Sequence, residues 1–284
     1  MKYHNTIRSH LFAVFGYVAL TLLYFYPVLS APSTSVIGDR DSFYFLWDIW
    51  WFKHSILDLF SNTLKTQAIF YPFQKVPVPW SSPVNELIGS PLYFIFGPQL
   101  TFNIITLASF PLAGYFFFLF LHRITGDTLA SFIGGYMYAF SPYHFIHANQ
   151  IGLTTIQWIP LFLIALGKYR EKPGCRQFLG LLLAAWLVAL SDPYTFVYFL
   201  VFFLVFLAFY WFRIAFGLLL LLPFLIGPFY IPMAGALSSM KGALDLYVEA
   251  ATYSQDLLKY IIPWKFHPLW GQFFRGFFPG DTLI

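Results

Sequence analysis

The chain has 284 residues, of which 59% are hydrophobic, 23% are aromatic and only 10% are charged, with a formal net charge of +4. Soluble domains carry about 25% charged residues, so this composition excludes a soluble globular protein and predicts a membrane protein. The Lys and Arg residues are spread through short connections rather than gathered on one face, which excludes nucleic acid as a partner. Cys175 is the only cysteine, so we expect no disulfide framework and no thiolate metal site.

Seven apolar stretches follow one another along the chain. A helix that crosses a bilayer needs about 20 mostly apolar residues, and most of these stretches are close to that length. The fifth is the shortest and ends at Asp192-Pro193, because proline cannot continue a helix. We therefore expect an all-α polytopic membrane protein with about seven transmembrane helices. The expected helices cover residues 11–30, 101–121, 129–147, 151–168, 177–191, 195–212 and 215–235.

The distribution of basic residues predicts how these helices are oriented, because Lys and Arg are enriched in short cytoplasmic connections. With a cytoplasmic N-terminus, every inner connection carries Lys or Arg, whereas the short outer turns at 148–150 and 191–194 carry neither. This pattern predicts an integral protein of the plasma membrane whose site lies on the outer face. The inner basic residues are Lys2, Arg8, Arg123, Lys168, Arg170, Lys172, Arg176 and Arg213.

The first outer loop, residues 31–100, is too long to be a simple turn. It contains no Gly or Pro between Asp41 and Lys65 and is rich in Trp and Phe, which predicts a helix over about 41–65 lying in the membrane interface. On a helical wheel, Asp41, Asp48 and Ser55 share one face, separate from an aromatic stripe. An irregular path back to the next helix is expected through Pro72, Pro77, Pro79, Pro83 and Pro91.

The chain divides by composition into a transmembrane core, residues 1–237, and a last segment, residues 238–284, of mixed polarity on the outer face. The last segment does not have the pattern of a complete domain, so we expect it to be the start of a longer outer segment. A naturally shortened chain of this kind would need a partner subunit to complete its fold.

Asp39 and Asp41 follow the first expected helix in a turn that begins with Gly38. Exposed carboxylates at this place can act as a general base toward an acceptor hydroxyl, or can bind a divalent cation. The alternative is structural, because aspartate is favoured at helix N-caps and in the first helical turn. The structural interpretation predicts that Asp39 caps a helix and that Asp41 is in its first turn.

Two further outer turns carry candidate site residues. His144 and His147 lie three residues apart and share a helical face, where they can bind metal or a phosphate, although histidines with polar tips in water are the more common case. Asp192 is at the outer end of the fifth helix, where an ionisable residue indicates function. The sequence Ser191-Asp192-Pro193 is equally typical of a turn that ends a helix.

In the last segment, Asp256 and His267 are candidates for contact with a polar headgroup. Each of these acids and histidines has an ordinary structural explanation, but nearly all of them are expected on the outer side. No phosphate-binding glycine loop is present, and the inner connections are too short to form a nucleotide-binding domain. The substrate is therefore expected to come from the membrane or the outer compartment, and a lipid-linked donor fits that restriction.

Several short motifs in the chain resemble those of the GT-C superfamily of integral membrane glycosyltransferases. They occur in order over most of the chain. The motifs are GD at 38–39, LWDIWWFKH at 46–54, AFSPY at 139–143, WIPLFL at 158–163, LSDPY at 190–194, DLL at 256–258 and HPLWG at 267–271.

The resemblance implies a GT-C core with an interfacial helix in the first outer loop, and a donor sugar carried on polyprenyl phosphate. It implies that the general base or metal-binding acid is Asp39, with Asp41 as the competing choice, and that Arg40 or His144 holds the donor phosphate. A divalent cation is a possible cofactor, and membrane lipids are expected partners. The alternative functions are a non-enzymatic carrier of lipid or polymer, and a structural membrane subunit.

Overall fold

In a computed structural model of the chain, the described residues are 2–58, 65–66, 76–77, 81–210 and the single positions 223, 227 and 231. The chain divides into two units, residues 1–237 and 238–284, and every described residue belongs to the first. The seventh expected helix is described only at the three single positions. Asp256 and His267 lie outside the described residues.

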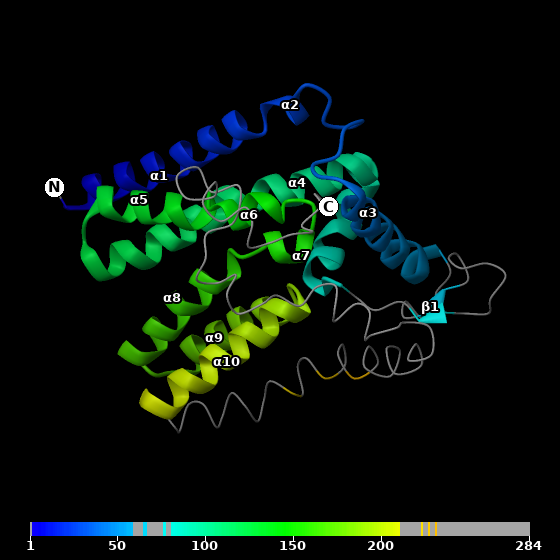
Figure 1. Ribbon diagram of the computed structural model, residues 1–284. Coiled ribbons are helices and arrows are strands. Elements are labelled where there is room, and N and C mark those ends of the chain that lie inside the picture. The colour runs from blue at the N-terminus through cyan, green and yellow to red at the C-terminus, as the bar shows by residue number, and fades with distance from the viewer. Residues whose placement is uncertain are drawn as a thin grey trace, which may run out of the picture. The chain divides into compact units, whose positions relative to one another are not determined.

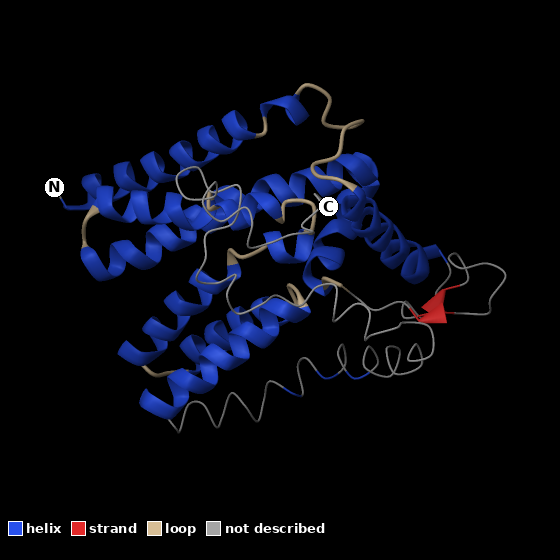
Figure 2. Cartoon of the chain, in the orientation of Figure 1, coloured by secondary structure: helices blue, strands red, loops and turns tan. Residues whose placement is uncertain are grey.

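The described part of the chain is almost entirely helical, which confirms the expected all-α class (Figures 1 and 2). The exception is a pair of two-residue antiparallel strands, β1 with β2. The elements in chain order are α1 Lys2–Tyr24, α2 Tyr26–Leu29, α3 Arg40–Lys53, the π-helix η1 His54–Asp58, β1 Lys65–Thr66, β2 Val76–Pro77, α4 Pro83–Thr125, α5 Thr128–Ala139, α6 Pro142–Ile146, α7 Ile151–Thr154, α8 Trp158–Glu171, α9 Cys175–Ala189 and α10 Pro193–Tyr210.

Two of the described helices are long and apolar enough to cross a membrane, namely α1 over Ile7–Tyr24 and α4 over Pro83–Thr125. The helices α9 and α10 are apolar but shorter. Two expected helices are interrupted: α5 ends at Ala139 before Pro142, and residues 151–168 are divided between α7 and α8. A proline removes a backbone donor, so a new helix, α6, begins at Pro142 rather than continuing α5.

Helix α4 begins 18 residues earlier than the expected span at 101–121. The irregular path expected at Pro83 and Pro91 is therefore wrong for these two prolines, which are both helical. Pro83 opens the helix, where its missing N–H costs nothing. A break at Gly97, with φ of 74°, precedes Pro98 and separates a short first arm from the long apolar second arm.

Helix α3 confirms that a helix begins next to Asp39, but it differs from the expected 41–65 segment in its end and its buried face. The α-helix ends at Lys53, η1 continues to Asp58, and Lys65 is in β1. Asp48 and Ser55, expected on a polar face with Asp41, are both buried. The reason is that α3 packs against α4, whose Glu86 lies within hydrogen-bonding reach of Asp48.

The helices pack around two cores. One is formed by α1, α3, α4 and α5, with Tyr17, Phe102 and Phe110 fully buried in it. The other is formed by α8, α9 and α10 around Phe162 and Leu181. Figure 1 shows these two groups, and α4 contacts members of both.

Candidate functional site

The turn before α3 depends on a glycine. Gly38 has a φ of +99°, and a Cβ atom at this position would lie 2.3 Å from Cβ of Asn149 and 2.6 Å from the hydroxyl oxygen of Ser42. A side chain is excluded both by the backbone conformation and by these contacts. Gly38 therefore lets the start of α3 pack directly against the connection between α6 and α7.

Both predicted acids are bound by this connection. Asp39 caps α3, since its Oδ1 accepts a hydrogen bond of 3.2 Å from the backbone N–H of Asp41, and this confirms the expected capping role. The same oxygen accepts a 2.7 Å hydrogen bond from the side-chain amide of Asn149. The carboxylate of Asp41 accepts a 2.7 Å bond from Gln150. Two consecutive amides thus hold two exposed carboxylates side by side.

These hydrogen bonds affect the protonation of Asp39. The Asn149 amide and then the Asp41 backbone N–H lower the pKa of Asp39 below its ordinary value, and the positive charge of Arg40 acts in the same direction. The hydrogen bonds therefore make the Asp39 carboxylate a weaker base than an ordinary aspartate. A carboxylate with a low pKa is a weak base, so it is better suited to orienting a hydroxyl or binding a cation than to removing a proton without help.

An open hollow of about 330 Å³ adjoins Asp39. Its walls are largely apolar, with Phe25 and Val28 on one side and Phe145 and Ile146 of α6 on the other. Its volume is within the range of small-ligand sites. A polar edge on an apolar hollow is a suitable place for an amphiphilic molecule whose polar group lies at the carboxylates.

A buried asparagine of α4 holds the loop that leads to Asp39. Asn103 has no exposed surface, and its Oδ1 accepts a 3.0 Å hydrogen bond from the N–H of Ile37. Its amide donates bonds to the carbonyls of Pro32 at 2.8 Å and Ser35 at 2.6 Å. Sequence reasoning missed this residue, although an amide within an apolar stretch is a recognisable signal.

The two predicted histidines have different environments. His144 is fully buried, so the expectation of a polar tip in water is wrong for it. Its ring stacks on Phe110 at 4.0 Å, and both ring nitrogens face carbonyl oxygens, of Ala139 at 2.5 Å and Thr154 at 2.6 Å. The ring has no exposed surface, and its two contacts join α6 to the end of α5 and to α7.

His147 is half-buried at the end of α6, two residues before Asn149. Its Nδ1 donates a 2.9 Å hydrogen bond to the carbonyl of Tyr143, which leaves Nε2 as the nitrogen that can accept a proton or bind a ligand. Of the two histidines, His147 is the one that keeps exposed surface.

Asp192 is nearly buried and caps α10. Its Oδ1 accepts hydrogen bonds from the backbone N–H groups of Tyr194 at 2.7 Å and Thr195 at 3.1 Å. Burial raises the pKa of this carboxyl. Gly152 packs against it, because a Cβ atom there would lie 2.9 Å from Oδ2. The capping interpretation accounts for Asp192, whose contacts join α10 to α7.

A pair of buried carboxyl groups, Asp48 on α3 and Glu86 on α4, was not predicted as a unit. Each is 2% exposed, and each side chain is within hydrogen-bonding reach of the other. Asp48 also accepts a hydrogen bond from the hydroxyl of Ser81, and Glu86 accepts one of 3.1 Å from the N–H of Ser82. Burial raises the pKa of Asp48 to about 6, and burial together with the neighbouring Asp48 raises that of Glu86 well above its ordinary value.

One proton between Asp48 and Glu86 accounts for this arrangement. Two buried negative charges in contact repel each other strongly, so one of the carboxyls stays protonated. That proton also satisfies Oε2 of Glu86, which has no other hydrogen-bond partner. The pair therefore fixes α3 to α4 as a unit that shares one proton and is closed to solvent.

A group of hydrogen bonds at the start of α4 joins it to neighbouring turns. The amide of Asn85 donates to the hydroxyls of Ser82 at 2.6 Å and Thr155 at 3.0 Å, and to the carbonyl of Ile151 at 3.2 Å. Ser82 in turn donates a 2.5 Å bond to the carbonyl of Ser191. These buried groups fix α4 relative to α7 and to the turn before α10.

The connection between α6 and α7 is thus the meeting point of the candidate site. It contacts Asp39 and Asp41 directly, and α7, which follows it, packs against Asp192. Within the part of the chain that the structure describes, no group of three or more His, Cys, Asp and Glu side chains is arranged to hold a metal ion. Comparisons with protein-family models, with curated proteins and with solved structures find no match to this chain.

Proposed function

We propose that this chain is an integral membrane glycosyltransferase of the GT-C type. It transfers a sugar from a polyprenyl-phosphate donor to an acceptor hydroxyl at the outer face of the plasma membrane. Seven spanning helices with a cytoplasmic N-terminus carry α3 at the outer interface. The proposal rests on the ordered motifs that resemble this superfamily and on the surroundings of Asp39.

The single observation that carries the proposal is the pairing of Asp39 and Asp41 with Asn149 and Gln150, at the edge of an apolar hollow. A polyprenyl phosphate has a long apolar chain and a compact charged end. The hollow suits the apolar part, and the carboxylates lie where the sugar and the acceptor hydroxyl would meet. The hydrogen bonds from Asn149 and Gln150 hold the carboxylates of Asp39 and Asp41 in place without a loop movement.

The proposed reaction is a direct displacement with inversion. The acceptor oxygen forms a bond to the anomeric carbon while the bond from that carbon to the phosphate oxygen breaks. The phosphate leaves with the bonding electrons. The hydroxyl proton passes to Asp39 late in the step, when the new bond to carbon has made the acceptor oxygen acidic enough for a weak base. Arg40 and His147 supply positive charge or a hydrogen bond for the leaving phosphate. Because the described residues offer no complete ligand set for a cation, no step is assigned to one.

The low pKa of Asp39 favours a second candidate function. A weak base suits recognition of a polar headgroup better than proton removal, so a non-enzymatic carrier would use the same four side chains for binding alone. The substitution Asp39→Asn distinguishes the two functions. It keeps the hydrogen-bonding shape that a carrier needs and removes the negative charge that an enzyme needs.

Native mass spectrometry of the protein purified in detergent tests the proposed ligand. We expect polyprenyl phosphate, or its sugar-bearing form, to co-purify, and its mass to identify the sugar. The variant Ala148→Phe, which fills the hollow, should no longer bind this lipid. A folded wild-type protein that carries only bulk phospholipid would contradict the proposal. Val205→Phe, an exposed apolar position on α10 and distant in sequence from the hollow, serves as the control.

A further inference from the structure

A second hollow, of about 400 Å³, lies between α8 and α9. Its apolar wall includes Leu161 and Ile164 of α8 and Leu183 of α9, and Lys168 and Arg176 border it. Lys168 is in the last turn of α8 and Arg176 in the first turn of α9, so both cations are at the same end of the helix pair. The hollow therefore has a charged end and an apolar body.

Small residues make room in the apolar part. Gly180 of α9 borders the hollow, and a Cβ atom at this position would have no neighbour within 4 Å. Leu183, which lines the hollow, is 58% exposed although it is a large apolar side chain. An elongated apolar group can lie along α9 at Gly180 and cover this exposed surface.

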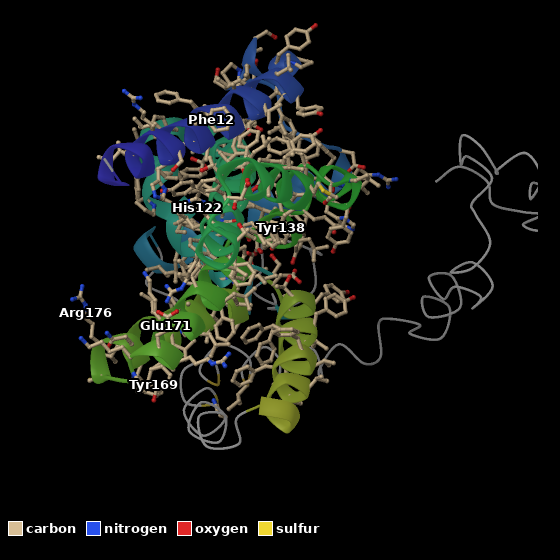
Figure 3. All side chains as sticks on the ribbon, turned by 90° about the vertical axis from the view of Figure 1, so that its left-hand side faces the viewer. Phe12, His122, Tyr138, Tyr169, Glu171 and Arg176 are labelled. Atoms are coloured by element: carbon tan, nitrogen blue, oxygen red, sulfur yellow. The ribbon has the colours of Figure 1, made fainter. Side chains whose placement is uncertain are left out.

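The charged end keeps its positive character. Glu171 is the acidic side chain nearest in sequence, and its carboxylate pairs with Arg123 of α4. The N-terminus of α9 has no side-chain cap, so its first N–H groups add to the positive potential. In Figure 3, Glu171, Tyr169 and Arg176 are labelled at the end of the helix pair where α8 meets α9.

We infer that this hollow binds an anionic phospholipid of the inner leaflet, with its phosphate at Lys168 and Arg176 and part of one acyl chain along Gly180. Basic pockets between helices on the cytoplasmic side are suited to acidic headgroups. The connection between α8 and α9 is the most basic of the expected inner connections, which puts the cations at the headgroup level. The inference is independent of the chemistry proposed for Asp39, and the two can fail separately.

The test measures binding of phosphatidylglycerol and phosphatidylcholine to the full-length protein in neutral detergent, by native mass spectrometry. The variant Lys168→Ala/Arg176→Ala should bind phosphatidylglycerol about tenfold more weakly, and the already weak binding of the zwitterionic phosphatidylcholine should fall by less. The control Arg170→Ala/Lys172→Ala removes two charges from the same connection, and neither residue borders the hollow. It should retain the wild-type affinity to within about twofold.

The variant Gly180→Leu tests the apolar part. It should fill the hollow without harming α9, because leucine is a better helix former than glycine. We expect phosphatidylglycerol binding to fall while binding of inorganic phosphate is unchanged. Three results would overturn the inference: equal loss in both double variants, unchanged binding in all variants, or displacement of the lipid by inorganic phosphate at the same concentration as by free lipid.

Discussion

The side-chain amide of Asn149 donates a 2.7 Å hydrogen bond to the carboxylate of Asp39, across 110 positions of the chain. This bond joins the start of α3 to the connection between α6 and α7, and it is the largest cause of the low pKa of Asp39. A single contact thus both positions the candidate acid and sets its charge.

Replacing Asn149 with alanine should raise the pKa of Asp39 toward its ordinary value, because the charged form loses its strongest hydrogen bond. Carboxyl-carbon NMR of protein labelled at aspartate measures this shift, and Asp39→Asn identifies the signal. The control is Gln150→Ala, which removes the neighbouring bond to Asp41. An Asp39 signal that titrates alike in wild type and Asn149→Ala would contradict the assignment.

Gly38→Ala should destabilise the protein more than Gly126→Ala does. Both glycines have positive φ, so each substitution forces a side chain into the left-handed region at about 1–2 kcal/mol. At Gly126 nothing lies within 4 Å of the added Cβ, whereas at Gly38 it would overlap Asn149 and Ser42. Thermal unfolding in detergent measures the difference, and equal losses at the two sites would show that α3 does not pack closely on Asn149.

The helical class, the start of α3 and the capping role of Asp39 follow from local sequence. Asp39 is a favoured cap residue, and the segment after it contains no Gly or Pro. The burial of Asp48 and His144 does not follow from local sequence, because it depends on residues of α4 that are distant along the chain: Glu86 for Asp48 and Phe110 for His144. A helical wheel distinguishes polar from apolar faces but does not show whether a polar face has buried partners.

The helix boundaries also do not all follow from local sequence. Prolines at Pro83 and Pro91 suggested an irregular loop, yet both are within α4. A proline at the first helical position is compatible with a helix, and Pro91 is accommodated within the first arm of α4. Asn103 and Glu86 lie within α4 rather than in the turns where the candidate acids and histidines were expected. Polar residues next to or within apolar stretches were the available signal.

Asn103→Ala should reduce the free energy of unfolding by about 2–3 kcal/mol. The substitution removes the partners of one buried N–H and two carbonyls of the loop from Pro32 to Ile37. The control is Ser109→Ala, a buried position on the same helix whose hydroxyl bonds only within α4. Chemical unfolding in mixed detergent micelles measures both changes. A loss no larger than that of Ser109→Ala would contradict the anchoring role of Asn103.

The pair of Asp48 and Glu86 predicts that the protein becomes less stable as pH rises from 4 to 8. The pKa of each carboxyl is higher in the folded state than in the unfolded state, so folding takes up protons in this range. Their stabilising effect is complete below the unfolded pKa values and is lost as pH rises through the folded values. A shift of one pKa unit corresponds to about 1.4 kcal/mol.

Glu86→Gln should reduce this pH dependence, because one ionisable member of the pair is removed and its hydrogen-bonding shape is kept. Thermal unfolding midpoints at pH 5 and pH 8 measure the effect. The control is Glu171→Gln, which alters an exposed acid paired with Arg123. If the wild type and Glu86→Gln show the same difference between the two pH values, the pair does not hold a proton.

The most direct measurement of the central claim is sugar transfer from a synthetic polyprenyl-phosphate donor, comparing the wild type with Asp39→Asn and Asp127→Asn. Asparagine remains a good N-cap, so both variants keep their helix starts. Asp127 caps α5 on the expected inner side and bonds the N–H of Ala130, which makes it a matched control. We predict that Asp39→Asn lowers turnover at least a hundredfold with donor binding retained, and that Asp127→Asn transfers sugar at the wild-type rate. Transfer by Asp39→Asn at a rate near that of the wild type would contradict the account.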